Sequence, residues 1–279
     1  RFDLEIEEDL IEEVARLYGF ENIPDHPPKA ELKMSAPPEA MRSVHTIRHR
    51  LAGEGYQEVV NFGFIDSQTE SHMGQANPIA ILNPIASQFG VMRSNLWGGL
   101  LHNLRSNLNR GVNRARLFEI GRVFQRDSNS IDQPGVVAGF IQNIQLGGLA
   151  YGFANPEQWA DSNQMVDFFD VKGDLQRTFN PLQIHTKMSA TPHPALHPGR
   201  SAQIYLAQQA IGWIGELHPA LQQTYNLANA PVVFEIYWDT ITQIGLPAPI
   251  EISKFPTVQR DIAVVVKQKD GMRYEKPDY

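Results

Sequence analysis

The sequence contains no cysteine in its 279 residues, which excludes disulfide bonds, iron–sulfur clusters and cysteine-based zinc sites. It has no run of eighteen apolar residues and no basic segment followed by an apolar one, so we expect neither a membrane-spanning helix nor a signal peptide. No internal repeat or low-complexity segment is present. These absences predict a cytoplasmic chain that depends on side-chain packing for its stability.

Charge is unevenly distributed along the chain. The formal net charge is −7, and residues 1–25 alone carry nine acidic and two basic side chains, which leaves the remainder neutral. Between Arg93 and Arg126 there are seven arginines and one acid, Glu119. This basic stretch is compatible with an anionic partner, and it is equally compatible with arginines solvated on helix and strand edges.

Residues 114–127 have the alternation of a long strand. Leu117, Glu119, Gly121 and Val123 point to one side, and a mostly apolar set that includes Phe118 and Ile120 points to the other. Residues 135–144 predict a second strand, so we expect an antiparallel hairpin with a polar loop at residues 127–134.

Helical periodicity predicts helices at residues 39–51, at 167–179 and in a segment that begins after Ser94 as its N-cap. Strands are predicted at residues 56–65, 183–188, 201–207, 211–216 and 232–238, with a further strand beginning at residue 255. Short helices are predicted at residues 218–225 and 239–244. This order predicts an α+β domain built around a mostly antiparallel sheet.

Residues 1–6 alternate as a short strand and precede an acidic helix that ends at Gly19. Asp9 can cap this helix, with Glu12 at its third position as in a capping box. The alternative is an oxygen site for Mg²⁺ formed by Asp9, Glu12 and Glu13 with Asp3 from the preceding strand.

His193 and His197 have the spacing of a helical zinc pair, but Pro192, Pro194 and Pro198 forbid the helix that would bring them together. A turn in which a histidine or Arg200 bonds to nearby backbone is the better prediction.

Seven segments, in this order, resemble the beta subunit of bacterial phenylalanyl-tRNA synthetase: RFDLEIEEDLIEEVARLYGFENIP, NPIASQFGVMRSNL, RLFEIGRVF, DFFDVKGDL, HPGRSA, IGELHP and FPTVQRDIAVVV. The resemblance implies the end of a B5 domain at residues 1–25, a Pro-rich linker at 26–38, a class II catalytic-like B6–B7 module at 39–249, and a linker with the first strand of a truncated, ferredoxin-like anticodon-binding domain at 250–279. It therefore implies a class II aminoacyl-tRNA synthetase-like antiparallel sheet flanked by helices, with a short helical N-terminal remnant.

The family's Asp-x5-Asp-x2-Glu-Glu pattern for a Mg²⁺ shared with the alpha subunit is matched by Asp3, Asp9, Glu12 and Glu13. Because the alpha subunit completes the site, the resemblance also implies that it can stay empty when that partner is missing.

Three class II motifs carry the adenylate chemistry in this family. The first, used in dimerisation, corresponds to residues 39–65. The second resembles residues 121–127, with Arg126 nearest the arginine that holds the ATP α-phosphate. The third requires a Gly-x-Gly strand and an arginine, but here Tyr237 and Trp238 stand at that place. The resemblance therefore implies a catalytically silent module with no catalytic and no cofactor-binding residue, while the alpha subunit uses the ATP.

The expected partners are the alpha subunit, in an alpha2-beta2 ligase that attaches phenylalanine to its tRNA, and the tRNA itself, through the Arg93 to Arg126 stretch. Without the alpha subunit, the chain is expected to self-associate through residues 39–65. Two alternatives are a self-sufficient class II amino-acid-activating enzyme, which lacks its third motif here, and an editing hydrolase, whose domain in this family has no counterpart in the sequence.

Overall fold

The computed structural model describes residues 3–27, 29, 42–74, 77–132, 137–159 and 163–242, and the single residues 258, 260, 261 and 263. The chain divides into two compact units, Arg1–Glu39 and Ala40–Tyr279. Along the described residues, no helix combines the length and the apolar character that crossing a membrane requires. The strand predicted from residue 255 falls largely on residues outside this description.

The first unit contains one α-helix, α1 (Glu7–Tyr18), followed by a 3-10 turn at Phe20–Asn22. The prediction that Asp9 is the N-cap was wrong, because α1 begins two residues earlier and places Asp9 in its first turn. From there, Asp9 Oδ2 accepts the backbone N–H groups of Glu5 (2.8 Å) and Ile6 (3.0 Å). Gly19 ends the helix with φ +93°, as predicted. The predicted strand at residues 1–6 is also wrong for residues 3–6, which are irregular.

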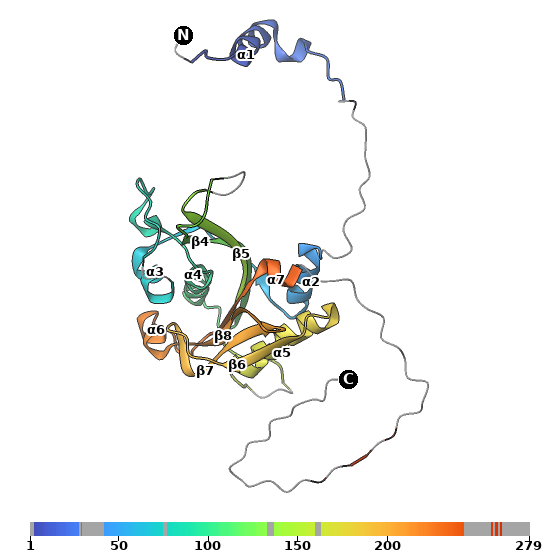
Figure 1. The fold of residues 1–279 in the computed structure, drawn as a ribbon, viewed down its shortest axis with the longest axis vertical. Helices are drawn as coiled ribbons and strands as arrows, with labels where there is room; N and C mark the ends of the chain where they lie inside the picture. Colours follow the sequence, from blue (N-terminus) through green and yellow to red (C-terminus); the bar gives the residue numbers. More distant parts are fainter. Residues whose placement is uncertain are drawn as a thin grey trace. The chain divides into compact units, whose positions relative to one another are not determined.

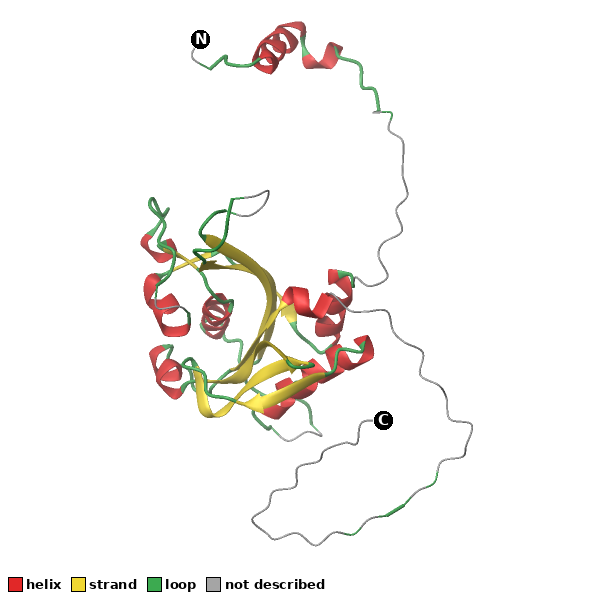
Figure 2. Ribbon diagram, viewed as in Figure 1, coloured by secondary structure: helices red, strands yellow, loops and turns green. Residues whose placement is uncertain are grey.

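The second unit is organised around a seven-stranded sheet in the order β1-β4-β5-β9-β8-β7-β6 (Figures 1 and 2). Only β1 and β4 are parallel, so the predicted antiparallel character is confirmed. The strands are β1 (Gln57–Glu58), β4 (Ala115–Arg126), β5 (Phe140–Tyr151), β6 (Thr186–Ala190), β7 (Leu196–Leu206), β8 (Gln209–Leu217) and β9 (Val232–Tyr237).

A second, two-stranded sheet pairs β2 (Phe64–Ile65) with β3 (Val91–Met92). The single strand predicted over residues 56–65 is therefore divided between two sheets, and residues 59–63 between its parts belong to neither.

The predicted hairpin forms the two longest strands of the large sheet, the second and third in its order. Strands β4 and β5 pair without interruption from Ala115↔Tyr151 to Arg126↔Phe140. The second strand starts at Phe140, after Gly139 with φ +81°, rather than at the predicted residue 135.

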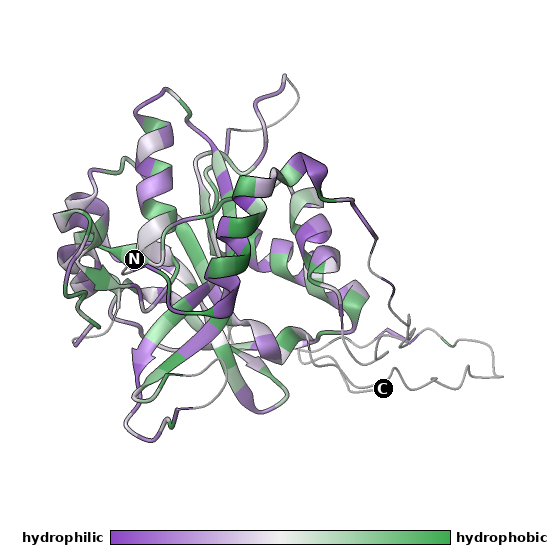
Figure 3. Ribbon diagram, turned by 90° about the horizontal axis from the view of Figure 1, so that it is seen from above, coloured by the Kyte–Doolittle hydropathy of each residue, from purple (hydrophilic) through white to green (hydrophobic). Residues whose placement is uncertain are grey.

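Helices cover both faces of this sheet (Figures 1 and 3). One face packs against α2 (Val44–Gly53), α5 (Phe168–Phe179) and α7 (Trp238–Thr242), with Phe118 and Phe234 among the buried side chains. The other face packs against α4 (Trp97–Leu108), beside which lie α3 (Ser67–Met73) and α6 (Pro219–Thr224).

The N-terminal caps of α5 and α4 differ in how well the nearby sequence predicts them. The helix predicted over residues 167–179 is α5, with Asp167 as its N-cap, and Asp170 accepts the Asp167 N–H to complete a capping box. Ser94 does not cap α4, because its hydroxyl donates to the buried carboxylate of Glu70. Asn95 Oδ1 instead accepts the N–H groups of Trp97 and Gly98.

Candidate functional site

The segments that resemble the second and third class II motifs lie on β4 and β9, on either side of β5. Their register places Glu119 opposite Gly147 and Gly147 opposite Glu235. Because side chains alternate along strands, these three positions share the sheet face under α4. We call Glu119, Gly147 and Glu235, with Gln145 one row further along, the polar row.

Glu119 is held by a buried ion pair with Arg93, whose Nη1 lies 2.8 Å from Glu119 Oε1. The two side chains are only 3% and 5% exposed. Asn61 donates its side-chain amide to Glu119 Oε2 (2.8 Å), and Arg93 Nε donates to the carbonyl of Arg122 (2.9 Å). A buried charge pair is more stable when further hydrogen bonds satisfy its other atoms, as these two bonds do for Glu119 Oε2 and Arg93 Nε.

Glu235 is the second buried acid of the row. The N–H of Leu96 donates to its Oε1 (2.6 Å), and one terminal atom of the Gln145 amide lies 2.7 and 2.9 Å from its two oxygens. Burial raises the pKa of Glu235 to about 8, although the Leu96 N–H and the charge of Arg93 act in the opposite direction. A protonated Glu235 can donate to the amide oxygen of Gln145, whereas an ionised one accepts from its nitrogen.

The space above the polar row is filled by protein. A Cβ atom on Gly147 would lie 2.8 Å from Leu96 Cβ, and one on Gly121 would collide with the guanidinium of Arg93. Trp97, at the start of α4, donates its indole N–H to the carbonyl of Phe234 on β9 (3.0 Å). The face of the sheet that carries the polar row is thus packed against α4.

The residues that correspond to the ATP-binding positions of the second and third motifs lie at the ends of β4 and β9. By strand alternation, the last position of β4 on the polar-row face is Gln125, and Arg126 lies on the other face, over the ring of Phe140 (5.9 Å). Tyr237 pairs with Gln145 and is partly exposed, while Trp238 is buried in the opposite core.

A cavity of about 510 Å³ opens beside α4, between residues 60–66 and α3. Its rim carries large exposed apolar side chains: Val60 is 90% exposed, Phe62 69% and Phe64 39%. We call these three residues the 60–64 patch. The cavity also contains His102 and Arg105 from α4.

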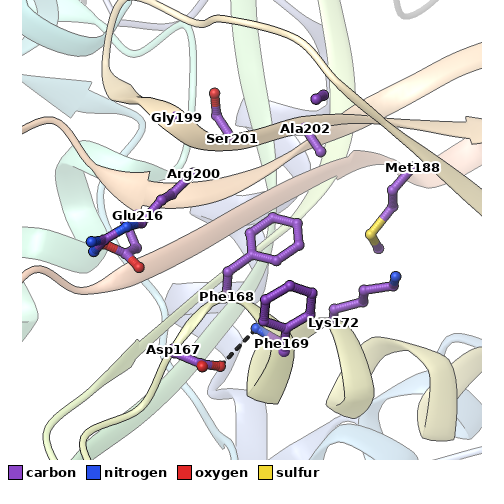
Figure 4. Close-up of a pocket in the computed structure, with 11 residues that line it drawn as sticks. Asp167, Phe168, Phe169, Lys172, Met188, Gly199, Arg200, Ser201, Ala202 and Glu216 are labelled. Carbon is purple, nitrogen blue, oxygen red and sulfur yellow. Dashed lines mark hydrogen bonds and ion pairs between the residues drawn. The ribbon is translucent and has the colours of Figure 1, made fainter. Parts of the chain in front are cut away.

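A second cavity, of about 500 Å³, lies at the N-terminus of α5 (Figure 4). Three segments that carry the family resemblance meet there: Asp167 to Lys172 from DFFDVKGDL, Gly199 to Ala202 from HPGRSA, and Glu216 from IGELHP. Arg200 pairs with Glu216 (2.7 Å), and Phe168 and Phe169 stand edge to face at 5.5 Å. No spacing in the sequence indicated this convergence, because the three segments belong to different elements.

The four predicted Mg²⁺ ligands all belong to the first unit. Their oxygen chemistry suits Mg²⁺, but Asp9 Oδ2 already accepts two backbone N–H groups and Glu13 pairs with Arg16 at 2.6 Å. In the part of the chain that the structure describes, no three His, Cys, Asp or Glu side chains are grouped to hold a metal. As arranged here, Asp3, Asp9, Glu12 and Glu13 do not form a metal cage, and the site stays a prediction.

The histidine segment contains backbone-bonding turns, as expected. His193 Nδ1 accepts the N–H of Ala195 (3.2 Å), and His197 Nδ1 accepts that of Gly199 (3.1 Å). The His193 ring lies between Trp97 (5.2 Å) and Trp213 (4.9 Å), and burial lowers its pKa.

The seven arginines from Arg93 to Arg126 do not form one surface. Arg93 and Arg116 are buried at 4% and 5% exposure, whereas Arg122 and Arg126 are exposed on β4. The buried arginines cannot contribute to the expected basic surface, which therefore contains only the exposed arginines, such as Arg122 and Arg126.

Over residues 23–238, the chain matches the family model of the phenylalanyl tRNA synthetase beta chain CLM domain. The chain belongs to this family. The resemblance inferred from its seven segments is thereby confirmed.

Curated relatives of this beta chain family are similar along nearly all of the chain. The phenylalanine–tRNA ligase beta subunit of Ralstonia nicotianae is 53% identical over 274 residues, which cover 98% of this chain and 34% of the relative. The Burkholderia pseudomallei subunit is 54% identical over 270 residues, which cover 96% of this chain and 33% of that relative. The chain thus spans about a third of the length of these relatives.

Among solved structures, a Desulfitobacterium hafniense pyrrolysyl tRNA synthetase matches with a TM-score of 0.53 and 12% identity, covering 72% of this chain and 66% of that one. At this identity the likeness concerns the fold alone: a mixed sheet flanked by helices.

Proposed function

We propose that this chain is a non-catalytic, class II-like module of the beta subunit of phenylalanine–tRNA ligase, which docks the alpha subunit and supports tRNA binding in the cytoplasm. The observation that carries the proposal is the packed polar row: Leu96 and the Arg93–Glu119 pair fill the face that an adenylate site would need. ATP is then used by the alpha subunit.

The domain assignment follows the family. Residues 1–25 are the end of a B5 domain, 26–38 a linker, 39–249 the B6–B7 module and 250–279 the beginning of an anticodon-binding domain. The shift from the first to the second compact unit after Glu39 is compatible with this division.

ATP–pyrophosphate exchange tests catalytic silence. The chain alone should give no exchange above a no-protein control with phenylalanine, whereas adding a bacterial alpha subunit should. Phenylalanine-dependent exchange by the chain alone, lost in Arg126→Ala, would favour the self-sufficient enzyme instead. Rapid hydrolysis of Tyr-tRNAPhe by the chain alone would favour an editing hydrolase.

The 60–64 patch is the proposed docking surface for the alpha subunit, because exposed apolar side chains clustered on one edge are typical of interfaces. Phe62→Ser should weaken co-purification with the alpha subunit at least tenfold. Phe169→Ser is the matched control, since its ring is as exposed (71% against 69%) but lies on α5. Equal loss with both variants would contradict this surface. Without the alpha subunit, the same patch supports self-association, which light scattering at rising concentration tests.

The proposed Mg²⁺ site at Asp3, Asp9, Glu12 and Glu13 requires ligands from the alpha subunit and a release of Asp9 from the backbone of Glu5 and Ile6. Isothermal titration of Mg²⁺ should therefore detect binding to the complex and none to the chain alone. Equal binding to both would contradict a shared ion.

A further inference from the structure

Two arginine side chains meet at the start of β4. Arg114 donates through Nε to the carbonyl of Phe153 (3.2 Å) and through Nη2 to that of Ala154 (3.1 Å). Arg116 donates through Nη2 to the same two carbonyls, at 3.4 and 3.0 Å. Two positive charges therefore share one pair of oxygen atoms.

Within the described residues, neither guanidinium forms an ion pair with a carboxylate. Among the described residues, every ion pair involves other cations, and Arg93, Arg177 and Arg200 each pair with an acid. Arg116 is nonetheless 95% removed from solvent. Carbonyl dipoles stabilise such a charge less than an anion does, so the pair favours an added negative group.

The two arginines line a cavity of about 510 Å³, together with Gln164 and Asn155. Nη1 of Arg114 and Nε of Arg116 form no hydrogen bond within the described part of the chain. These atoms are the donors that a bound anion would use.

Three acids face the arginines across the cavity and limit the charge that it accepts. Glu54 accepts from Arg177 (2.7 Å), Asp174 from the Tyr56 hydroxyl (2.9 Å), and Asp170 from a backbone N–H (2.8 Å). With Arg177 included, three cations face three anions. Several phosphates inside the cavity would be repelled by these acids, whereas a single phosphate attached to a group with hydroxyl donors suits the mixed lining.

We propose that this cavity binds a single sugar-linked phosphate, as found in a nucleoside monophosphate or in an RNA backbone, with Arg114 and Arg116 donating to its oxygens. The inference does not depend on the proposed function. It assigns the site to a face of the sheet other than that of the polar row.

Titration of the intact chain with 5′-AMP at constant ionic strength tests the proposal. Arg114→Gln should weaken AMP binding at least tenfold, because it removes a charge and a donor fork. Arg122→Gln is the matched control, since this arginine is exposed on β4, which begins directly after Arg114, and its side chain makes only a 3.4 Å bond to a carbonyl. It should change the affinity less than twofold. Thermal unfolding of both variants establishes that they fold.

Two measurements on the unmodified chain make the test independent of variants. Inorganic phosphate should compete with AMP while sodium chloride at equal ionic strength does not, and ATP should bind no more tightly than AMP. Absence of saturable AMP binding, equal losses in both variants, or ATP binding more than tenfold tighter would each overturn the proposal. If Arg114→Gln also weakens a short single-stranded RNA tenfold, the natural source is an RNA backbone; if RNA binding is unchanged while AMP binding falls, it is a free nucleotide.

Discussion

Replacing Glu235 with glutamine should change the pH dependence of stability in a way that depends on one buried carboxyl group. Its pKa in the folded chain is raised from 4.5 to about 8 because the group is fully buried. The folded state therefore holds a proton that the unfolded state releases between these values. Stability from this group is complete below pH 4.5 and is lost as the pH rises toward 8.

The magnitude follows from the width of that interval. Each pH unit is worth about 1.4 kcal/mol, so the free energy of unfolding should fall by about 3 kcal/mol between pH 4.5 and pH 7 because of Glu235 alone. Glutamine cannot ionise, yet it can accept the Leu96 N–H and donate to Gln145, as a protonated glutamate does. Glu235→Gln should thus remove this loss and keep the local contacts.

Urea unfolding followed by circular dichroism at several pH values measures the effect. The contributions of the other titrating groups cancel in the difference in free energy of unfolding between Glu235→Gln and the parent chain. This difference should grow by about 3 kcal/mol from pH 4.5 to pH 7. Glu58→Gln is the control, because its partly exposed pair with Arg48 contributes little. A difference that stays constant from pH 4.5 to pH 7 would show that Glu235 is ionised in the folded chain, and the reasoning would be wrong.

Two further predictions concern packing and protonation. Gly147→Ala should lower the free energy of unfolding by about 1–3 kcal/mol, because the added Cβ would overlap Leu96. Gly53→Ala is the control and should not lower it, since a Cβ there has open space around it. Chemical unfolding compares the two variants, and equal stability of both would refute the close contact. Because burial between two tryptophans lowers the pKa of His193, the unfolded chain binds a proton there first, so stability should fall as the pH drops below 6.5. His193→Gln should remove the part of this pH dependence that comes from His193. If the free energy of unfolding of the variant falls below pH 6.5 as steeply as that of the parent chain, the prediction is refuted.

The sequence predicted the elements whose signals are local. The β4–β5 hairpin, the helix α5 and the end of α1 at Gly19 depend on alternation, helical periodicity and a positive φ within a few residues. The structure of residues 56–65 was harder to predict from the sequence. Their strand pairing depends on β3 and β4, which lie far along the chain.

The polar row could not be predicted from the pattern of β4 alone. Glu119 alternates with apolar residues, which by itself suggests a position near solvent, and only its long-range partner Arg93 explains its burial. Glu235 is hidden in an apolar strand, and its partner Leu96 lies 139 residues away. The family resemblance indicated the missing ATP groups, but the filling of the face by α4 required the three-dimensional arrangement.

The polar row has a consequence for how the sheet assembles. A shift of β9 by one residue against β5 would turn Glu235 toward the apolar core on the opposite face, where it would have no hydrogen-bond donors. The same shift would bring Phe234 beneath Leu96 and place its ring beside the Arg93–Glu119 pair. A shift by two residues would separate Glu235 from the Leu96 N–H. Apolar strands alone tolerate such errors, since one buried aliphatic residue resembles another. The buried acids therefore distinguish the correct strand register from its neighbours, which gives charges at the centre of the sheet a structural use.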